Sequence, residues 1–167
     1  MLLCNRRLII LGGASALAGC GFEPAYGTGG SASKLQGRVR VDDPVGRPAY
    51  LLTREIEERL GAGPSLENGG AYGLSYAITV DEAPLAILSN NTATRFNVTG
   101  SVTYALRDLE STAVLVSGQE RNFTSYSASG TPVATQAAAR DAEERLMVTL
   151  ADQIITRLIA ESGNLPI

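Results

Sequence analysis

The sequence predicts an α+β domain with the element order β-α-β-β-β-α, in which a four-stranded, mostly antiparallel sheet carries two helices on one face. In three segments between residues 72 and 126, apolar residues recur at every second position, the period of a half-buried strand. In two other segments, 49–60 and 133–162, they recur at three- and four-residue intervals, as in an amphipathic helix. The connections between the three alternating segments are short, which favours an antiparallel meander.

The first strand and the first helix are separated by a turn-forming segment. We expect the strand at Lys34–Val41, where Asp42-Asp43-Pro44 ends it. The helix is expected at Ala49–Leu60, and Gly61 suits the left-handed conformation that ends many helices. The apolar stripe of this helix consists of Leu52, Ile56 and Leu60. This stripe is the face that we expect to be buried.

The second and third strands are expected to form a hairpin. The second covers Tyr72–Val80; beyond Pro84, Leu85–Leu88 is either an extension past a bulge or an edge. Asn90-Asn91 marks the turn, and the third strand follows from Arg95 to Arg107. The residues of the third strand that we expect to face the helices are Phe96, Val98, Val102, Tyr104 and Leu106. Its odd-numbered residues are then expected on the opposite face.

The fourth strand is expected at Thr112–Tyr126, after a short connection at Asp108–Ser111. Its alternation begins with Val114 and Val116, but Phe123 falls on the opposite parity. A β-bulge near Gly118 would restore the pattern, because one extra residue reverses the side on which later side chains lie.

The last helix is expected from Val133 to about Ser162, with Gly163 at its end. Its apolar stripe consists of Leu146, Leu150, Ile154 and Leu158. A helix of thirty residues spans about 45 Å, more than a domain of this size needs. If the helix has a break, we expect it in the alanine-rich first half. The two helices cover one face of the sheet and leave the other open.

The N-terminus predicts a lipoprotein signal peptide, residues 1–19. Arg6 and Arg7 precede an apolar stretch, Leu8–Ala18, that spans about 16 Å as a helix, whereas a membrane core needs about 30 Å. The stretch ends in Leu17-Ala18-Gly19-Cys20, which resembles the bacterial lipobox. The resemblance implies cleavage before Cys20 and acylation of its thiol. We expect a lipidated flexible tether at 20–33, one globular domain at 34–163 and a tail at 164–167.

The composition excludes several classes of function. Histidine is absent, so Ser-His-Asp and Cys-His catalysis and histidine-bearing zinc sites are excluded. The net charge of −3 offers no basic footprint for nucleic acid. Neighbouring carboxylates occur at Asp42-Asp43, Glu57-Glu58 and Glu143-Glu144, where we expect solvated surfaces. We therefore predict no enzyme, cofactor or metal site.

The third and fourth strands carry the candidate binding residues. From Ala83 to Arg107 the only charged residues are Arg95 and Arg107, and Arg121 follows on the next strand. Arginine binds phosphate through two parallel hydrogen bonds, so these side chains suit an anionic lipid headgroup. The alternative is that they keep the sheet soluble, or pair with Asp108 and Glu120.

Three segments together resemble the LPS-assembly lipoproteins of the LptE family, in particular its alphaproteobacterial branch. They are the lipidated opening Cys20–Gly27, the helix Tyr50–Leu60, and the end of the sheet with the last helix, Ser125–Ile154. The resemblance implies a non-enzymatic, lipid-anchored protein on the periplasmic side of the outer membrane. Such a protein plugs and helps assemble the β-barrel LptD and contacts lipopolysaccharide through basic residues. Because Lys34 is the only lysine here, arginine would supply that contact.

A second class of function is a lipid carrier, or an auxiliary lipoprotein of an ABC-type lipid transporter. A carrier needs an enclosed apolar cavity, whereas the polar open face and the thin alanine-rich helix favour a solid plug. A periplasmic cell-wall hydrolase is disfavoured because no catalytic constellation is present.

Overall fold

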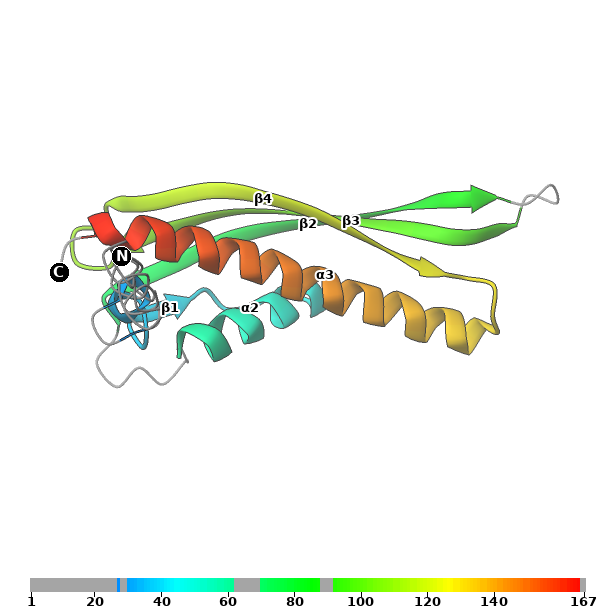
Figure 1. The fold of residues 1–167 in the computed structure, drawn as a ribbon, viewed down its shortest axis with the longest axis horizontal. Helices are drawn as coiled ribbons and strands as arrows, with labels where there is room; N and C mark the ends of the chain where they lie inside the picture. The colour runs from blue at the N-terminus through cyan, green and yellow to red at the C-terminus, as the bar shows by residue number, and fades with distance from the viewer. Residues whose placement is uncertain (1–26, 28–29, 62–69, 88–91, 166–167) are drawn as a thin grey trace, which may run out of the picture.

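The computed structural model describes residues 27, 30–61, 70–87 and 92–165. The signal peptide, Cys20, most of the tether and the predicted turn at Asn90-Asn91 lie outside this part of the chain. The elements are, in chain order, η1 (Ser31–Lys34), β1 (Val39–Val41), α2 (Arg47–Leu60), β2 (Tyr72–Ile87), β3 (Ala93–Asp108), β4 (Val114–Ser127), α3 (Pro132–Glu161) and η2 (Ser162–Asn164). Figure 1 shows them as an elongated two-layer domain.

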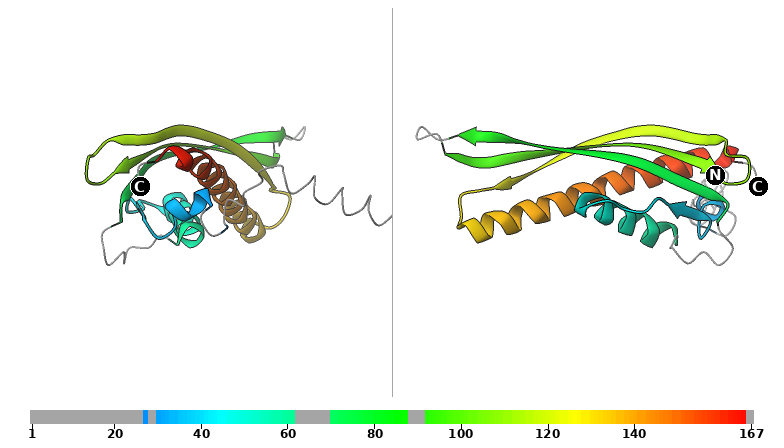
Figure 2. Two further views of the ribbon diagram at one scale, coloured as in Figure 1. Left: turned by 60° about the vertical axis from the view of Figure 1, so that its left-hand side comes forward. Right: turned by 180° about the vertical axis from the view of Figure 1, so that it is seen from behind.

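The sheet confirms the predicted fold class. Its strand order is β1-β2-β3-β4; β1 runs parallel to β2, and the other two pairs are antiparallel. Both helices lie on the same side of the sheet, which arches over α3 (Figure 2). β2 continues past Pro84 to Ile87 with register shifts on either side of Ala86, so of the two alternatives for Leu85–Leu88 the structure shows the extension past a bulge; Leu88 lies outside the described residues.

The first strand is shorter than predicted. Instead of an extended Lys34–Val41, the chain forms a turn of 3-10 helix at Ser31–Lys34, and pairing begins only at Val39. Gly37 causes the difference: its φ of 67° is left-handed, and its N–H donates to the carbonyl of Leu60 at 2.7 Å. Leu35 is fully buried as expected, but from a turn rather than a strand.

The predicted bulge at Gly118 is wrong. β4 keeps one register from Val116 to Ser127, and the shift lies at Leu115, between the pairs Leu106–Val116 and Arg107–Val114. Gly118 is opposite Tyr104, where an added Cβ would lie 2.7 Å from the tyrosine hydroxyl. The glycine therefore makes room for a buried ring. Because parity is kept, Phe123 points away from the helices and is 69% exposed.

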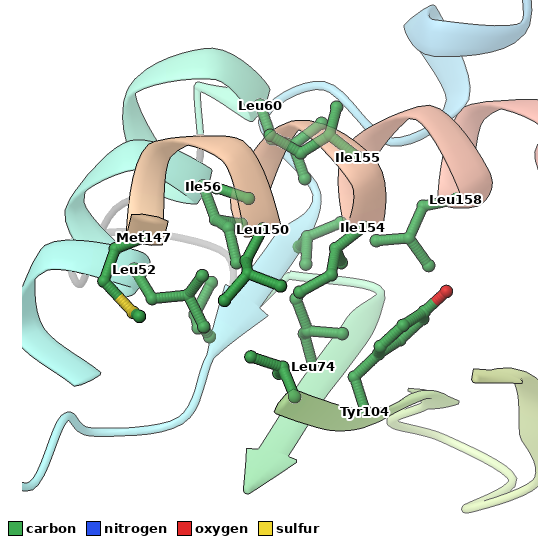
Figure 3. Packing of buried hydrophobic residues seen from close by; sticks show 14 of the residues in the cluster. Leu52, Ile56, Leu60, Leu74, Tyr104, Met147, Leu150, Ile154, Ile155 and Leu158 are labelled. Atoms are coloured by element: carbon green, nitrogen blue, oxygen red, sulfur yellow. The ribbon is translucent and has the colours of Figure 1, made fainter. Parts of the chain in front are cut away.

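The last helix is unbroken over its thirty residues. The hydroxyl of Thr131 accepts a hydrogen bond from the N–H of Ala134 at 3.3 Å and so caps its start. The predicted stripe is fully buried, and in Figure 3 Ile154 and Leu158 lie nearest Tyr104, whereas Leu150 lies toward Leu52 and Ile56 of α2. This packing is close at Gly100, where an added Cβ would lie 2.9 Å from Leu150 Cδ1.

Ion pairs hold the two helices side by side. Arg47 Nε lies 3.0 Å from Glu143, Arg54 Nη2 lies 3.1 Å from Glu144, and Arg59 pairs with Asp152. These side chains are largely exposed, and such pairs each stabilise a protein by about 0–1 kcal/mol. The pairs join the beginning, middle and end of α2 to α3, so they orient the two helices rather than supply most of the stability.

Candidate functional site

The candidate site is the outer face of the sheet, by which we mean the side of β2, β3 and β4 that points away from the helices. The even-numbered residues of β3 face the helices: Val98, Val102, Tyr104 and Leu106 are at most 4% exposed, as predicted, and Phe96 is partly buried against the same core. The odd-numbered residues stand on the outer face. Neither α2 nor α3 covers this face, so its side chains are not part of the core that the helices and the sheet share (Figure 2).

All three predicted arginines lie on the outer face. Arg95 and Arg107 are near opposite ends of β3, and Arg121 of β4 is opposite Ser101, midway between them. Each step along the strand is six residues, or about 20 Å. The three side chains are exposed and form a row along the sheet rather than one cluster.

The alternative partners proposed for these arginines are engaged elsewhere. Asp108 Oδ1 accepts hydrogen bonds from the N–H groups of Ser111 and Glu110 at 2.7 and 2.9 Å, and these bonds lower the pKa of Asp108. Glu120 faces the helices and accepts from the hydroxyl of Tyr104 at 3.4 Å. Within the described residues, no ion pair involves Arg95, Arg107 or Arg121.

The outer face is positive although the whole chain is negative. By parity, β2 contributes one carboxylate to this face, that of Asp81, whereas β3 and β4 contribute the three arginines. The other strand carboxylates point inward, where Glu82 accepts from the hydroxyl of Tyr126 at 2.9 Å. Burial, together with the neighbouring carboxylate, raises the pKa of both Tyr104 and Tyr126 to about 12, so both hydroxyls stay protonated donors.

Sequence reasoning missed one residue of this face. Phe123 is 69% exposed and stands two residues from Arg121 on the same side of β4. Its odd parity was the signal, and it was mistaken for evidence of a bulge. Phe123 is the one aromatic residue that the described strands carry on this face.

The remaining carboxylate pairs form no catalytic arrangement in the described part of the chain. Glu143 and Glu144 are paired with arginines of α2. Asp42 and Asp43 line an open cleft of about 360 Å³ beside α2 and β2, and burial raises the pKa of Glu57 nearby. Among the described residues there is no group of three or more side chains suited to a metal ion, and no helix long and apolar enough to cross a membrane.

Solved structures share the fold. A lipoprotein from Caulobacter crescentus CB15 matches with a TM-score of 0.67 and 23% identity, over 83% of this chain and 100% of that one. Rare lipoprotein B from Shewanella oneidensis matches with a TM-score of 0.58 and 14% identity, over 75% and 95% of the two chains. A minor lipoprotein from Acinetobacter baumannii matches with a TM-score of 0.57 and 16% identity, over 73% and 90%.

At these identities the structures establish the fold, and the family follows from the sequence itself. Among curated protein sequences, none matches this chain. The family model LptE, described as lipopolysaccharide-assembly, matches residues 37–158, which include all four strands, α2 and most of α3. With the predicted element order confirmed and a match over most of its length, the chain belongs to the LptE family of lipopolysaccharide-assembly lipoproteins.

Proposed function

We propose that this chain is the outer-membrane, periplasm-facing lipoprotein subunit of a lipopolysaccharide export translocon. In this role it plugs and helps assemble an LptD-type β-barrel, and it contacts lipopolysaccharide through its outer face. The family match over residues 37–158 carries the proposal, because the LptE family implies an LptD partner and lipopolysaccharide binding. The opening Cys20–Gly27 and the helix Tyr50–Leu60 support the alphaproteobacterial branch.

The membrane anchor is proposed to be Cys20. Two or three acyl chains anchor a protein stably, whereas one chain alone is marginal, because each buried CH₂ group contributes about 0.8 kcal/mol. In bacterial lipoproteins an aspartate after the lipidated cysteine often retains the protein in the inner membrane, so Gly21 at this position favours the outer membrane. Cys20→Ala should abolish acylation and leave unprocessed precursor, which gel mobility and mass spectrometry of the membrane fraction detect. A variant that is processed normally and remains with its membrane partner would refute the lipoprotein assignment.

The lipopolysaccharide contact is proposed to involve Arg95, Arg107 and Arg121. Arg95→Glu tests it, since an exposed strand arginine contributes little to folding and a reversed charge repels an anion. We expect an unchanged melting temperature, weaker binding of lipopolysaccharide, and a wild-type affinity that falls more steeply with salt than that of the variant. Arg140→Glu on α3 is the matched control, because this exposed arginine lies on the other layer and, like Arg95, is in no ion pair among the described residues. Equal affinities of wild type and Arg95→Glu would assign Arg95 to solubility alone.

The internal packing favours a plug over the alternative of a lipid carrier. The core of the described residues is one continuous cluster that both helices and the sheet fill. Clefts of about 300 to 500 Å³ beside it are open, and each has charged side chains in its wall. Purification of the lipidated chain from outer membranes separates the two functions. A stoichiometric complex with a large barrel supports the plug, and a monomer that carries phospholipid supports the carrier.

A further inference from the structure

The ring of Phe123 is exposed and lies outside the hydrophobic core. It stands on the outer face of β4, opposite Thr99 of β3, which in turn is opposite Asp81 of β2. Its side chain is 69% exposed, whereas the aromatic residues that fold the domain are buried: Tyr72, Tyr104 and Tyr126 are at most 9% exposed. The hydrophobic effect alone does not explain a phenylalanine here, since a polar residue of high strand propensity would fit the same position.

The side chains around the ring of Phe123 are polar, and the register of the strands sets their positions. Asp81, Thr99 and Phe123 form one row across three strands, about 10 Å long. Along β4, Arg121 and Ser125 stand on either side of the ring, each about 7 Å away. The amide of Asn97 donates to the hydroxyl of Thr99 at 3.3 Å, which orients that hydroxyl.

An exposed aromatic ring among polar side chains suits neither an acyl chain nor a phosphate alone. An acyl chain needs several apolar neighbours, but the side chains beside Phe123 are hydroxyls, a carboxylate and a guanidinium. A phosphate alone needs the cation but not the ring. A sugar ring uses both: its C–H groups lie against the electron-rich face of an aromatic ring, while its hydroxyls meet polar groups at the edge.

We propose that Phe123 is the stacking platform for a saccharide ring of lipopolysaccharide, with Asp81 and Thr99 as partners for its hydroxyls and Arg121 for an anionic substituent. The proposal rests on the proposed function, because that function brings lipopolysaccharide to this face. It assigns the sugar portion of the ligand to the middle of the sheet. The arginines at either end then remain for other anionic groups of the same ligand.

The experiment measures binding of fully deacylated lipopolysaccharide, which keeps sugars and phosphates but has no acyl chains, to the full lipidated chain in detergent. Phe123→Leu keeps an apolar side chain and removes the ring face; Phe123→Tyr keeps the ring. We expect Phe123→Leu to bind about 2- to 10-fold more weakly, the range of one aromatic contact, and Phe123→Tyr to bind as wild type does. Tyr50→Leu is the matched control, because Tyr50 is a 56% exposed aromatic on α2.

Salt separates stacking from charge. The loss in Phe123→Leu should be the same at low and high salt, whereas the loss in Arg121→Gln should shrink at high salt. Equal affinity of Phe123→Leu and wild type would overturn the proposal. So would an equal loss toward phosphatidic acid, which has acyl chains and a phosphate but no sugar ring and would make Phe123 an acyl-chain contact, or a loss of barrel copurification with saccharide binding intact.

The outcomes also distinguish this inference from the proposed function. If Arg95→Glu weakens lipopolysaccharide binding and Phe123→Leu does not, the saccharide platform is wrong and the function stands. If Phe123 is needed for saccharide binding but no barrel copurifies with the chain, the platform stands and the translocon assignment is wrong.

Discussion

The contact between Gly100 and α3 gives a test of how the helix is seated on the sheet. Leu150 is fully buried, and its Cδ1 atom would lie 2.9 Å from a Cβ added at Gly100. Leu146 Cδ2 would lie 3.1 Å from the same Cβ. A Gly100→Ala substitution therefore pushes against two leucines, and a Leu150→Ala substitution removes the nearer of them.

The magnitudes follow from these contacts. Leu150→Ala should lower the free energy of unfolding by about 2–5 kcal/mol, because it leaves a cavity in a packed core. Gly100→Ala should cost about 1–3 kcal/mol through overpacking. In the double variant the new methyl group occupies part of the vacated space, while Leu146 still opposes it. The double variant should therefore be about 1–2 kcal/mol more stable than the sum of the single effects predicts.

Urea unfolding followed by circular dichroism measures all four proteins of this cycle. The control is Gly118→Ala combined with Leu150→Ala. Gly118 pairs with Tyr104, four residues or about 13 Å along β3 from Gly100, so these effects should add within about 0.5 kcal/mol. Additive effects of Gly100→Ala and Leu150→Ala would refute the close packing of Leu150 of α3 on Gly100 of β3.

Two further predictions concern pH. Hydrogen bonds from Ser111 and Glu110 hold the pKa of Asp108 below its ordinary value of 3.8. The ionised carboxylate therefore stabilises the fold above pH 3.8, and this effect is lost as the pH falls through the lower pKa of the folded state. Asp108→Ala should lower the melting temperature at pH 7, and its difference from wild type should disappear in acid. Burial raises the pKa of Tyr104 and Tyr126 from 10 to about 12. The free energy of unfolding should therefore fall between pH 10 and 12, where these phenols ionise in the unfolded chain only. Absorbance titration should show both tyrosines ionising near pH 12, and ionisation near pH 10 would contradict their burial.

Periodicity predicted the fold because each element keeps one face in the core over many residues. The stripe of Leu146, Leu150, Ile154 and Leu158 and the alternation of β3 required no knowledge of the rest of the chain. The errors lie where one residue serves a distant neighbour. Gly37 turns the chain so that its N–H reaches the carbonyl of Leu60, and no local pattern at Lys34–Val41 contains that contact.

Gly118 and Phe123 show the same limit in the candidate site. Glycine in a strand indicates either a bulge or a close approach, and only the position of Tyr104 across β3 decides between them. The bulge prediction then turned Phe123 inward in error. The side on which Arg95 and Arg107 lie was predictable from parity. The predicted bulge would have turned Arg121 inward with Phe123, so its side, like the spacing of the three arginines, needed the register of β3 against β4.

The row of Arg107, Arg121 and Arg95 runs along the long axis of the domain. The carbonyl of Ser31, eleven residues after the proposed anchor Cys20, accepts a hydrogen bond from the hydroxyl of Ser162, so Ser31 lies at the end of α3. Arg107 lies at that end of the sheet, and Arg95 lies toward the opposite end of the β2–β3 hairpin (Figure 1). With Arg121 between them, an anionic ligand that moves along the outer face meets a cation about every 20 Å. Separate, exposed cations of this kind hold each anion weakly, because solvent and salt screen them. This arrangement suits a surface that guides a ligand past a plug better than one that retains it.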